Sequence, residues 1–335
     1  MRVVVVGATG NVGRETLQVL AERNFPAQEV IALASDRSAR VEVSYGEEKI
    51  LKVQPLSQFD FKGTDVAFFC AGSKVSSEWA PKAAAAGAIV IDKSSYFRMH
   101  EDVPLVVPEV NAAQVQALGA TAKGRMIANP NCVAIPLVMA LKPLHDLAGL
   151  KRVVISSYQS VSGAGKDAMD ELFNQSRAIF VGDAPKVEHL PKQIAFNLLP
   201  HIGGFLKDGR TDEEAKIEEE TSKILGLNVP LSATCVRVPV FIGHSISVNA
   251  EFERPLTATQ ARNALGRMPG VLVLDAPERE IYVTPLEVVG EDAVVVSRIR
   301  EDRSQANTLN FWVSADNLRK GAALNAVQIA ESCIR

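Results

Sequence analysis

A cysteine that follows an Asn-Pro-Asn stretch is the residue of this chain best suited to nucleophilic chemistry. The run Asn129-Pro130-Asn131-Cys132 leads straight into an apolar segment, residues 133–144, which predicts a helix. A helix N-terminus carries unpaired N–H groups and a partial positive charge, so a thiol placed there is favoured as thiolate. Asn131 is a good candidate N-cap, and Pro136 falls near the first turn, where a missing N–H costs little. The stretch therefore predicts Cys132 as a nucleophile, against the alternative of a buried structural cysteine.

Two further side chains suit chemistry on an anionic substrate. Arg237 lies in an apolar run, where an unpaired guanidinium would be costly, so we expect it to bind an anion. His244 follows seven residues later; a lone histidine is more often structural, but beside a nucleophile it is the obvious general acid/base. Before them, residues 152–159 read as a strand and residues 160–165 as a glycine-rich turn into a helix from Lys166, which is typical of close backbone approach to a ligand.

The elements that must position these residues begin with a strand, a tight turn and a helix. Residues 2–7 form a β-branched run, residues 11–22 have helical spacing, and the turn between them reads Gly7-Ala-Thr-Gly10-Asn-Val-Gly13. Small residues there let the backbone approach a pyrophosphate at the helix N-terminus. The motif alone is weak, but further strands at 30–34, 66–70 and 88–91, with a helix near 79–86, predict a parallel, doubly wound sheet.

The end of the second strand indicates which nicotinamide cofactor to expect. It reads Ser35-Asp36-Arg37-Ser38-Ala39-Arg40. An acidic residue binds the ribose 2′-hydroxyl of NAD, whereas an arginine accommodates the 2′-phosphate of NADP. Arg37 and Ser38, with Arg40 in reserve, favour NADP, although Asp36 keeps NAD open.

Length and composition narrow the class of protein. A chain of 335 residues exceeds a usual single core, so we expect two domains, and the net charge of −3 without a basic stripe argues against nucleic acid as a partner. We expect no secretory signal and no membrane span. Four scattered cysteines without metal-ligand spacing fit reduced thiols in a cytoplasmic enzyme, with no disulfide and no metal.

Over essentially its whole length the chain resembles the bacterial aspartate-β-semialdehyde dehydrogenases. Eight motifs occur in that family's order: Gly7-Ala-Thr-Gly-x-Val-Gly13, Ala34-Ser-x-Arg-Ser38, Ser95-Tyr-Phe-Arg98-Met99, Val107-Pro-Glu-Val-Asn111, Asn129-Pro-Asn-Cys132, Gln159-x-Val-Ser-Gly-Ala-Gly165, Glu213-x-x-Lys216 and Arg237-Val-Pro-Val-x-x-Gly-His244. The chain departs from the expected pattern at Lys93, Tyr96, Val133-Ala134 and Arg40, without loss of a catalytic group.

The resemblance implies a reaction and a role for each matched residue. The reaction is the NADPH-dependent reduction of L-aspartyl-4-phosphate to L-aspartate-4-semialdehyde and phosphate, toward lysine, threonine and methionine, through a thioester that then accepts hydride. Cys132 would attack, His244 would serve as acid/base, and Gln159 would orient the acyl group, with Asn131 beside them. The substrate would meet Arg237 at its carboxylate, Glu213 at its ammonium, and Arg98 and Lys216 at its phosphate. The cofactor would contact Gly7, Thr9, Gly10, Asn11, Val12, Arg37, Ser38, Ser162, Gly163 and Asn317.

The resemblance also implies a layout. We expect an α/β fold with an N-terminal Rossmann-type parallel sheet over residues 1–130, a second α+β catalytic and dimerisation domain over 131–314, and a C-terminal helix, 315–335, returning to the first domain. Strands near 248–252, 293–299 and 309–313 suit a sheet whose outer face pairs subunits, so we expect a homodimer or homotetramer. Two rivals stay open at this point. One is an N-acetyl-glutamyl-phosphate reductase, against which Glu213 argues, and the other is a non-catalytic paralogue acting as a binding protein.

Overall fold

Two compact units make up the chain. The computed structural model describes residues 1–38, 41–47, 49–118 and 124–334. Unit 1 comprises Met1–Asn131 and Gly321–Arg335, and unit 2 comprises Cys132–Lys320. The domain boundaries expected from the sequence lay near 130 and 314, and the units divide after residues 131 and 320.

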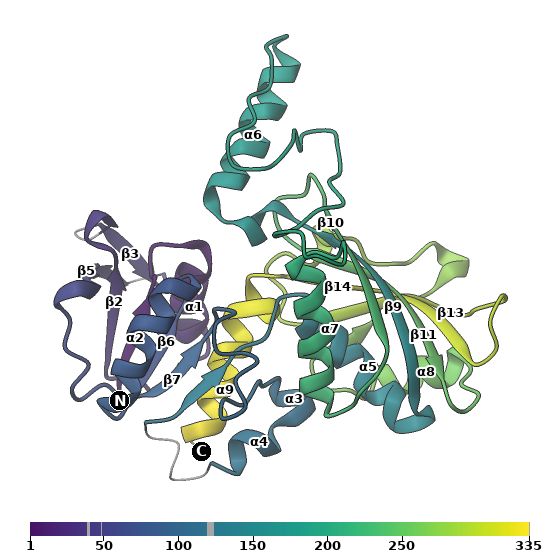
Figure 1. Ribbon diagram of the computed structural model, residues 1–335, viewed down its shortest axis with the longest axis horizontal. Coiled ribbons are helices and arrows are strands. Elements are labelled where there is room, and N and C mark those ends of the chain that lie inside the picture. Colours follow the sequence, from purple (N-terminus) through teal and green to yellow (C-terminus); the bar gives the residue numbers. More distant parts are fainter. Residues whose placement is uncertain (39–40, 48, 119–123, 335) are drawn as a thin grey trace. The chain divides into compact units, whose positions relative to one another are not determined.

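Unit 1 is built on a six-stranded parallel sheet (Figure 1). Its strand order is β5-β2-β1-β6-β7-β8, with β1 at Arg2–Val6, β2 at Glu29–Ala34, β5 at Gln54–Pro55, β6 at Val66–Phe69, β7 at Ile89–Asp92 and β8 at Met126–Ala128. Strands covered on both faces read as continuous apolar runs, and Val3, Val4 and Val5 are fully buried. This order reverses direction beside β1, as in dinucleotide-binding sheets, and confirms the predicted Rossmann-type fold.

Helices cover this sheet and complete its core. Helix α1 (Asn11–Glu22) buries Leu17 and Leu20 in the core, and α2 (Ser73–Ala85) begins earlier than the sequence predicted. Short elements fill the connections: a hairpin of β3 (Glu42–Tyr45) and β4 (Lys49–Lys52), the 3₁₀ turns η1 (Asp36–Ser38) and η2 (Leu56–Gln58), and the one-turn helices α3 (Pro108–Asn111) and α4 (Ala113–Gln116).

The C-terminal helix belongs to unit 1, but it begins later than predicted. Residue 315 ends strand β14 (Thr308–Ala315); a π-helical turn follows at Arg319–Ala323, and α9 spans Leu324–Ile334. The carboxylate of Asp316 accepts the N–H groups of Leu318 (2.8 Å) and Arg319 (3.1 Å), so a side chain caps this turn after the strand has ended. Within unit 1, Asn325 Nδ2 donates to the carbonyl of Val106 at 2.9 Å.

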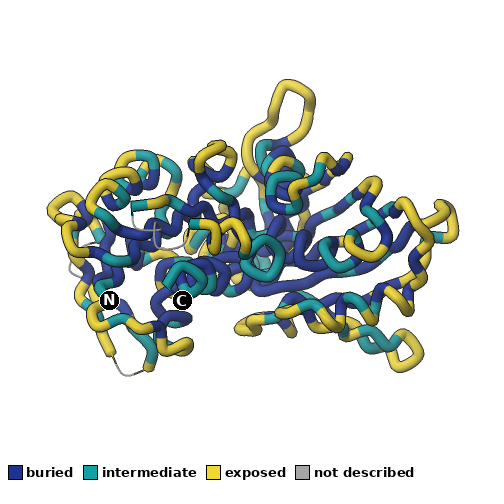
Figure 2. Tube along the Cα trace, turned by 90° about the horizontal axis from the view of Figure 1, so that it is seen from below, coloured by how far each residue is buried: buried dark blue, intermediate teal, exposed yellow. Residues whose placement is uncertain are grey.

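Unit 2 is built on a mixed six-stranded sheet with the order β10-β9-β11-β14-β13-β12. The remaining bounds are β9 at Leu150–Gln159, β10 at Leu231–Arg237, β11 at His244–Phe252, β12 at Val271–Val273 and β13 at Val294–Glu301. Helices α5 (Ala134–Ala148), α7 (Asp212–Leu225) and α8 (Ala258–Leu265) form one layer against it, because α5 contacts both others. The 3₁₀ turns η5 (Pro277–Arg279) and η6 (Pro285–Val288) lie between β12 and β13. The strands are largely buried, and exposed residues gather in loops and on outer helices (Figure 2).

An arm projects from unit 2 (Figure 1). Helix α6 (Lys166–Phe180) forms its length, and the loop that follows is tied back to the helix by two buried side chains. Glu171 accepts the N–H of His189 at 2.6 Å, and Gln175 accepts the N–H of Ile194 at 2.9 Å. The arm therefore has a defined shape although its own core is small.

Two general findings concern the described residues. None of their helices is long and apolar enough to cross a membrane. The four cysteines are free thiols.

Candidate active site

Cys132 lies just before helix α5 rather than inside it. The N-cap residue is Val133, and the first helical hydrogen bond runs from Leu137 N to Val133 O at 3.2 Å. The prediction of Asn131 as N-cap is therefore wrong. The physical reason is Pro136, which lacks an N–H: at the third helical position none is needed, whereas a helix begun at Cys132 would require one there. Cys132 still directly precedes the N-cap residue.

Strands β9 and β10 place two rows of side chains side by side on one face of the sheet. These strands are parallel, with Gln159 opposite Arg237 and Ser157 opposite Cys235. Because side chains alternate between faces, residues two apart on each strand share a face. All four side chains are buried. The sheet thus brings together Gln159 and Arg237, two of the predicted site residues.

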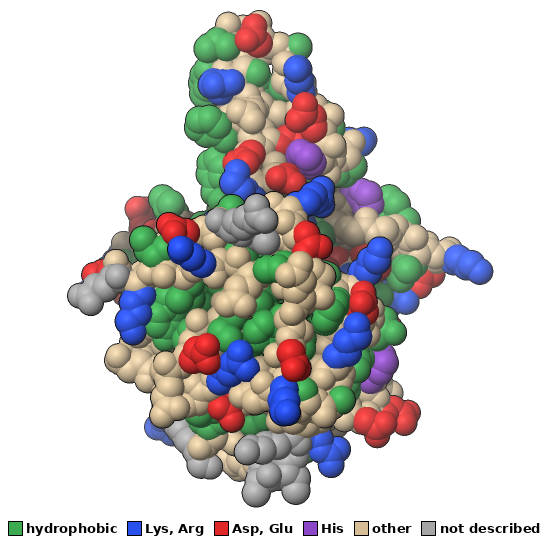
Figure 3. Space-filling view, turned by 90° about the vertical axis from the view of Figure 1, so that its left-hand side faces the viewer, with side chains coloured by type: hydrophobic (Ala, Val, Ile, Leu, Met, Phe, Trp, Pro, Cys, Tyr) green, Lys and Arg blue, Asp and Glu red, His purple; other side chains and the backbone are tan. Residues whose placement is uncertain are grey.

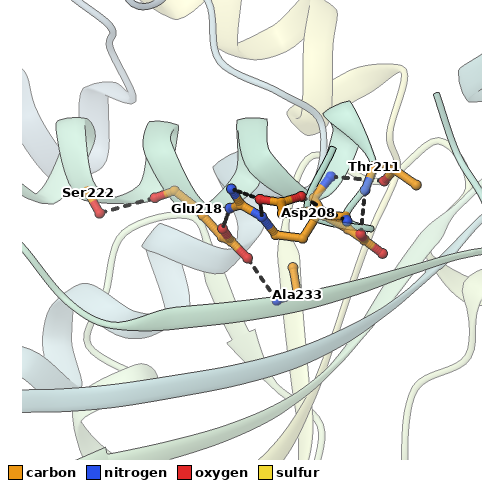
Figure 4. Close-up of polar contacts among 7 residues, drawn as sticks. Asp208, Thr211, Glu218, Ser222 and Ala233 are labelled. Atoms are coloured by element: carbon orange, nitrogen blue, oxygen red, sulfur yellow. Dashed lines mark hydrogen bonds and ion pairs between the residues drawn. The ribbon is translucent and has the colours of Figure 1, made fainter. Parts of the chain in front are cut away.

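Helix α7 is fastened over this face by its own carboxylates. Strand β10 is an edge strand, and Glu214 accepts the N–H of Cys235 (3.0 Å) while Glu218 accepts that of Ala233 (3.3 Å). A capping box at Thr211 begins the helix, and Arg210 contacts Asp208 and Glu218 (Figure 4). The two carboxylates therefore accept backbone N–H groups of an edge strand that would otherwise have no partner in the sheet. They also fix the position of α7 relative to β10.

Fixing α7 brings Glu213 to the site. Gln159 Nε2 donates to Glu213 Oε1 at 3.2 Å, and Lys216 Nζ lies 3.9 Å from Glu213 Oε2. Lys216 also contacts Asp212 at 3.2 Å. Glu213 and Lys216 thus lie on one face of α7, as expected, and the Glu213 carboxylate contacts the side chain of Gln159.

His244 is buried with a defined tautomer. It is 1% exposed, and its Nδ1 accepts the backbone N–H of Ser160 at 3.1 Å. A backbone N–H can only donate, so the neutral ring carries its proton on Nε2, which has no hydrogen-bond partner among the residues that the structure describes. Burial, and then the positive charge of Arg237, lower the pKa of His244 to about 3. At neutral pH the ring is therefore uncharged, and its Nε2–H group can donate a hydrogen bond.

Gly163 lets a turn pack closely against His244 and Arg237. It lies in the 3₁₀ turn η4 (Val161–Ala164), and a Cβ at this position would come within 3.2 Å of both His244 Nε2 and Arg237 Nη1. Arg237 Nη1 donates to the carbonyl of Ser160 at 2.8 Å. Burial lowers the pKa of Arg237, and the Cys132 thiol interacts with it electrostatically in the opposite direction. The nucleophile, the guanidinium and the imidazole thus belong to one cluster in unit 2.

Asn317 supports the turns on both sides of His244. Its Oδ1 accepts the N–H of Gly243 (2.9 Å) and the hydroxyl of Ser160 (3.1 Å), and its Nδ2 donates to Ser162 Oγ (2.9 Å). The structure therefore joins Asn317 and Ser162, both predicted as cofactor contacts, in one buried network.

In unit 1 the glycine turn has the shape that a dinucleotide needs. Gly7 has φ +82°, and a Cβ on it would lie 2.8 Å from Cys70 O; a Cβ on Gly13 would lie 2.1 Å from Gly7 O. A side chain at either position would require the backbone to move. The two glycines therefore allow the start of α1 to pack against the end of β1. The turn between these two glycines contains Thr9, Gly10, Asn11 and Val12. Because its backbone stays close to the start of α1, the residues present fit a pyrophosphate.

The remaining predicted residues lie in unit 1. Arg37 is exposed and Ser38 half-buried in η1, where Asp36 accepts the Ser57 hydroxyl at 2.7 Å; Arg40 lies outside the described residues. Arg98 is buried and donates to Asn129 O (3.0 Å) and Lys93 O (2.8 Å), so it fixes the segment leading to Cys132. Asn131 is buried at the end of unit 1. No group of acidic, histidine or cysteine side chains suited to a metal occurs among the described residues.

Sequence reasoning missed two residues beside the site, Ser157 and Cys235. A signal existed, since each lies two positions before a predicted site residue on the same strand. It also missed the carboxylates Glu214 and Glu218, whose role depends on the pairing of α7 with an edge strand.

Comparison with known proteins agrees with this geometry. The family model "Semialdehyde dehydrogenase, NAD binding domain" matches residues 2–118, and "Semialdehyde dehydrogenase, dimerisation domain" matches residues 141–320. The fold and the site thus define a semialdehyde dehydrogenase, an oxidoreductase with a nucleotide-binding unit and a separate dimerisation unit.

Individual relatives narrow the class. An aspartate-semialdehyde dehydrogenase of Rickettsia conorii is 55% identical over 99% of this chain and 97% of its own. The crystal structure of aspartate semialdehyde dehydrogenase II from Vibrio cholerae, complexed with ASA, has a TM-score of 0.95 at 42% identity and covers 100% of this chain and 98% of that one. A Candida albicans aspartate semialdehyde dehydrogenase with NADP has a TM-score of 0.74 at 25% identity and 99% coverage of both chains. The chain belongs to the aspartate-semialdehyde dehydrogenase family, which confirms the resemblance found in the motifs.

Proposed function

We propose that this protein reduces L-aspartyl-4-phosphate to L-aspartate-4-semialdehyde and phosphate, and runs the reverse reaction when phosphate is supplied. The observation that carries the proposal is the cluster of unit 2: Cys132 just before α5, with buried Arg237, Gln159 and His244, of which Arg237 and His244 lie against Gly163. The test is phosphate-dependent reduction of NADP with aspartate semialdehyde and purified protein. A protein that reduces no NADP under these conditions would contradict it.

The residues of unit 2 divide the covalent step among them. The Cys132 thiolate forms a bond to the acyl carbon, and phosphate leaves with the electron pair of the broken C–O bond. His244, neutral with its proton on Nε2, is set to donate to the oxygen that develops negative charge. Gln159 orients the acyl group. When bound, the nicotinamide cofactor would supply the hydride that reduces the acyl group, and the carbon–sulfur bond to Cys132 then breaks, which releases the aldehyde and returns the thiolate.

Charge placement supports the proposed substrate. Arg237 has a planar guanidinium suited to bind the α-carboxylate in bidentate fashion, and Glu213 supplies the negative charge for the ammonium. The phosphate role of Lys216 in unit 2, the phosphate role of Arg98 in unit 1 and the catalytic role of Asn131 stay predictions. So does the contact of Ser162, Gly163 and Asn317 with the cofactor.

The cofactor is NADP in this proposal, supported by Arg37 and Ser38 at the end of β2. Removing the guanidinium in Arg37→Ala should weaken NADPH far more than NADH, by roughly 10- to 150-fold, because a charge-assisted phosphate contact contributes about 1.5–3 kcal/mol. The measurement is the affinity of each cofactor by fluorescence titration. Asp36→Asn is the matched control variant. If Arg37→Ala lowers the affinities for NADPH and NADH equally, Arg37 does not bind the 2′-phosphate, and Asp36 remains the candidate ligand of the ribose.

The protein is a homodimer in this proposal. The face of the unit 2 sheet opposite Gln159 carries half-exposed aromatic rings, Tyr158 and Trp312, with centroids 5.2 Å apart. Hydrophobic side chains also run along one edge of the projecting arm (Figure 3). Within helix α6 of this arm, Phe173 and Phe180 are exposed. Such surfaces mark contacts between proteins. Light scattering should give a mass near twice 36.1 kDa, and a mass near the single value would contradict the dimer.

We also place the protein in a reducing, cytoplasmic setting, supported by its four free cysteines. Given the family to which the chain belongs, no specific observation favours either rival function, the N-acetyl-glutamyl-phosphate reductase or the non-catalytic paralogue.

A further inference from the structure

Gln159 is held from both ends of its side-chain amide. Its Nε2 donates to Glu213 at 3.2 Å, and its Oε1 accepts the hydroxyl of Ser157 at 3.0 Å. A carboxylate has no hydrogen to give, so the nitrogen of the amide must face Glu213 and the oxygen must face Ser157. An amide turned by 180° would oppose its oxygen to the carboxylate of Glu213 and would leave the Ser157 hydroxyl without its acceptor. The orientation is therefore determined by these two partners.

Ser157 stands at the start of a short row of hydrogen bonds. It is fully buried, and its hydroxyl donates to Gln159 Oε1 at 3.0 Å. Gln159 in turn donates from Nε2 to Glu213. The hydrogen bonds therefore run in one direction, from the Ser157 hydroxyl to the Glu213 carboxylate.

We propose that Ser157 is a positioning residue for the reaction, which acts by fixing the amide orientation of Gln159. The inference rests on the role given to Gln159 in the proposed function. It accounts for a buried serine that has no part in the covalent step proposed above. Ser157 lies two residues before Gln159 on the same strand, so both side chains are on one face and the hydroxyl reaches the amide.

The first test compares Ser157→Ala, Ser157→Thr and a matched control in the phosphorylating direction. Ser157→Ala removes the donor to Oε1, and we expect kcat to fall about tenfold with the KM for aspartate semialdehyde changed less than about twofold, the scale of one buried hydrogen bond. Ser157→Thr keeps the hydroxyl and should recover most of kcat. The control is Ser314→Ala, which removes the buried 2.7 Å bond to Ser245 on the opposite face and should lower the melting temperature without lowering kcat.

A double-mutant cycle separates positioning from general loss of stability. In the Gln159→Ala background the amide is gone, so adding Ser157→Ala should change kcat by less than about twofold. The proposal is overturned if Ser157→Ala retains the wild-type kcat, or if it slows the enzyme equally with and without Gln159. Failure of the wild-type protein itself to turn over would instead refute the proposed function.

Discussion

Replacing Cys132 with alanine should reduce turnover by about 10⁴-fold or more, because no other group of the site can form the covalent intermediate. The variant should bind NADPH as the wild type does, since the dinucleotide turn at Gly7 and Gly13 lies in unit 1. The two measurements are steady-state turnover and cofactor titration. Cys333→Ala, in α9, is the matched control and should retain full activity.

Thiol labelling provides an independent measure of the same assignment. Burial raises the pKa of Cys70, of Cys235 to about 12 and of Cys333 to about 11, so these thiols are protonated and slow to react at neutral pH. Brief treatment with iodoacetamide followed by peptide mass spectrometry should find Cys132 modified first. Faster modification of Cys235 or Cys70 would show that the nucleophile had been misassigned.

The enzyme should reject an N-acetylated substrate strongly. Acetylation removes the positive charge of the ammonium and leaves the Glu213 carboxylate, which is already bonded to Gln159, facing an amide in a largely buried site. Unpaired buried polar groups discriminate by about 2–4 kcal/mol, which corresponds to roughly 30- to 1000-fold in kcat/KM. The extra methylene of N-acetylglutamate semialdehyde adds about 1–3 kcal/mol.

The measurement is kcat/KM for aspartate semialdehyde and for N-acetylglutamate semialdehyde in the phosphorylating direction. Glu213→Gln keeps the size of the side chain and removes its charge, so it should narrow the preference, chiefly by lowering kcat/KM for aspartate semialdehyde. Equal or better activity of the wild type on the acetylated aldehyde would refute the role of Glu213.

Local patterns sufficed to predict the nucleotide-binding fold. Strands of a parallel sheet are buried on both faces, so Val3 to Val6 read as one apolar run. The turn after this run has local requirements too, because Gly7 has a positive φ and a side chain on Gly13 would meet the backbone of Gly7. Local patterns also paired Glu213 with Lys216, since residues three apart share a helix face.

Features that depend on the rest of the fold escaped prediction, together with one that has a local cause. The local case is the start of α5, because Pro136 excludes the N-cap that Asn131 favours. The predicted start of the final helix is too early, because helical spacing does not show that β14 continues to Ala315. The position of Cys235 opposite Ser157 follows only once β9 and β10 are known to pair in register, and Glu214 and Glu218 acquire their role only against an edge strand.

The return of α9 to unit 1 has a consequence for how the protein is made. Leu324, Val327 and Ile329 belong to the same core as Val3 and Leu17, so the nucleotide-binding unit lacks part of its interior until the last residues of the chain have been synthesised. Unit 2 is continuous in sequence and emerges complete from the ribosome before α9 does. The order of folding during translation should therefore be the reverse of the order along the chain, with the catalytic unit formed first. A chain that ended just after Lys320 would carry a complete catalytic unit attached to an unfinished nucleotide-binding one.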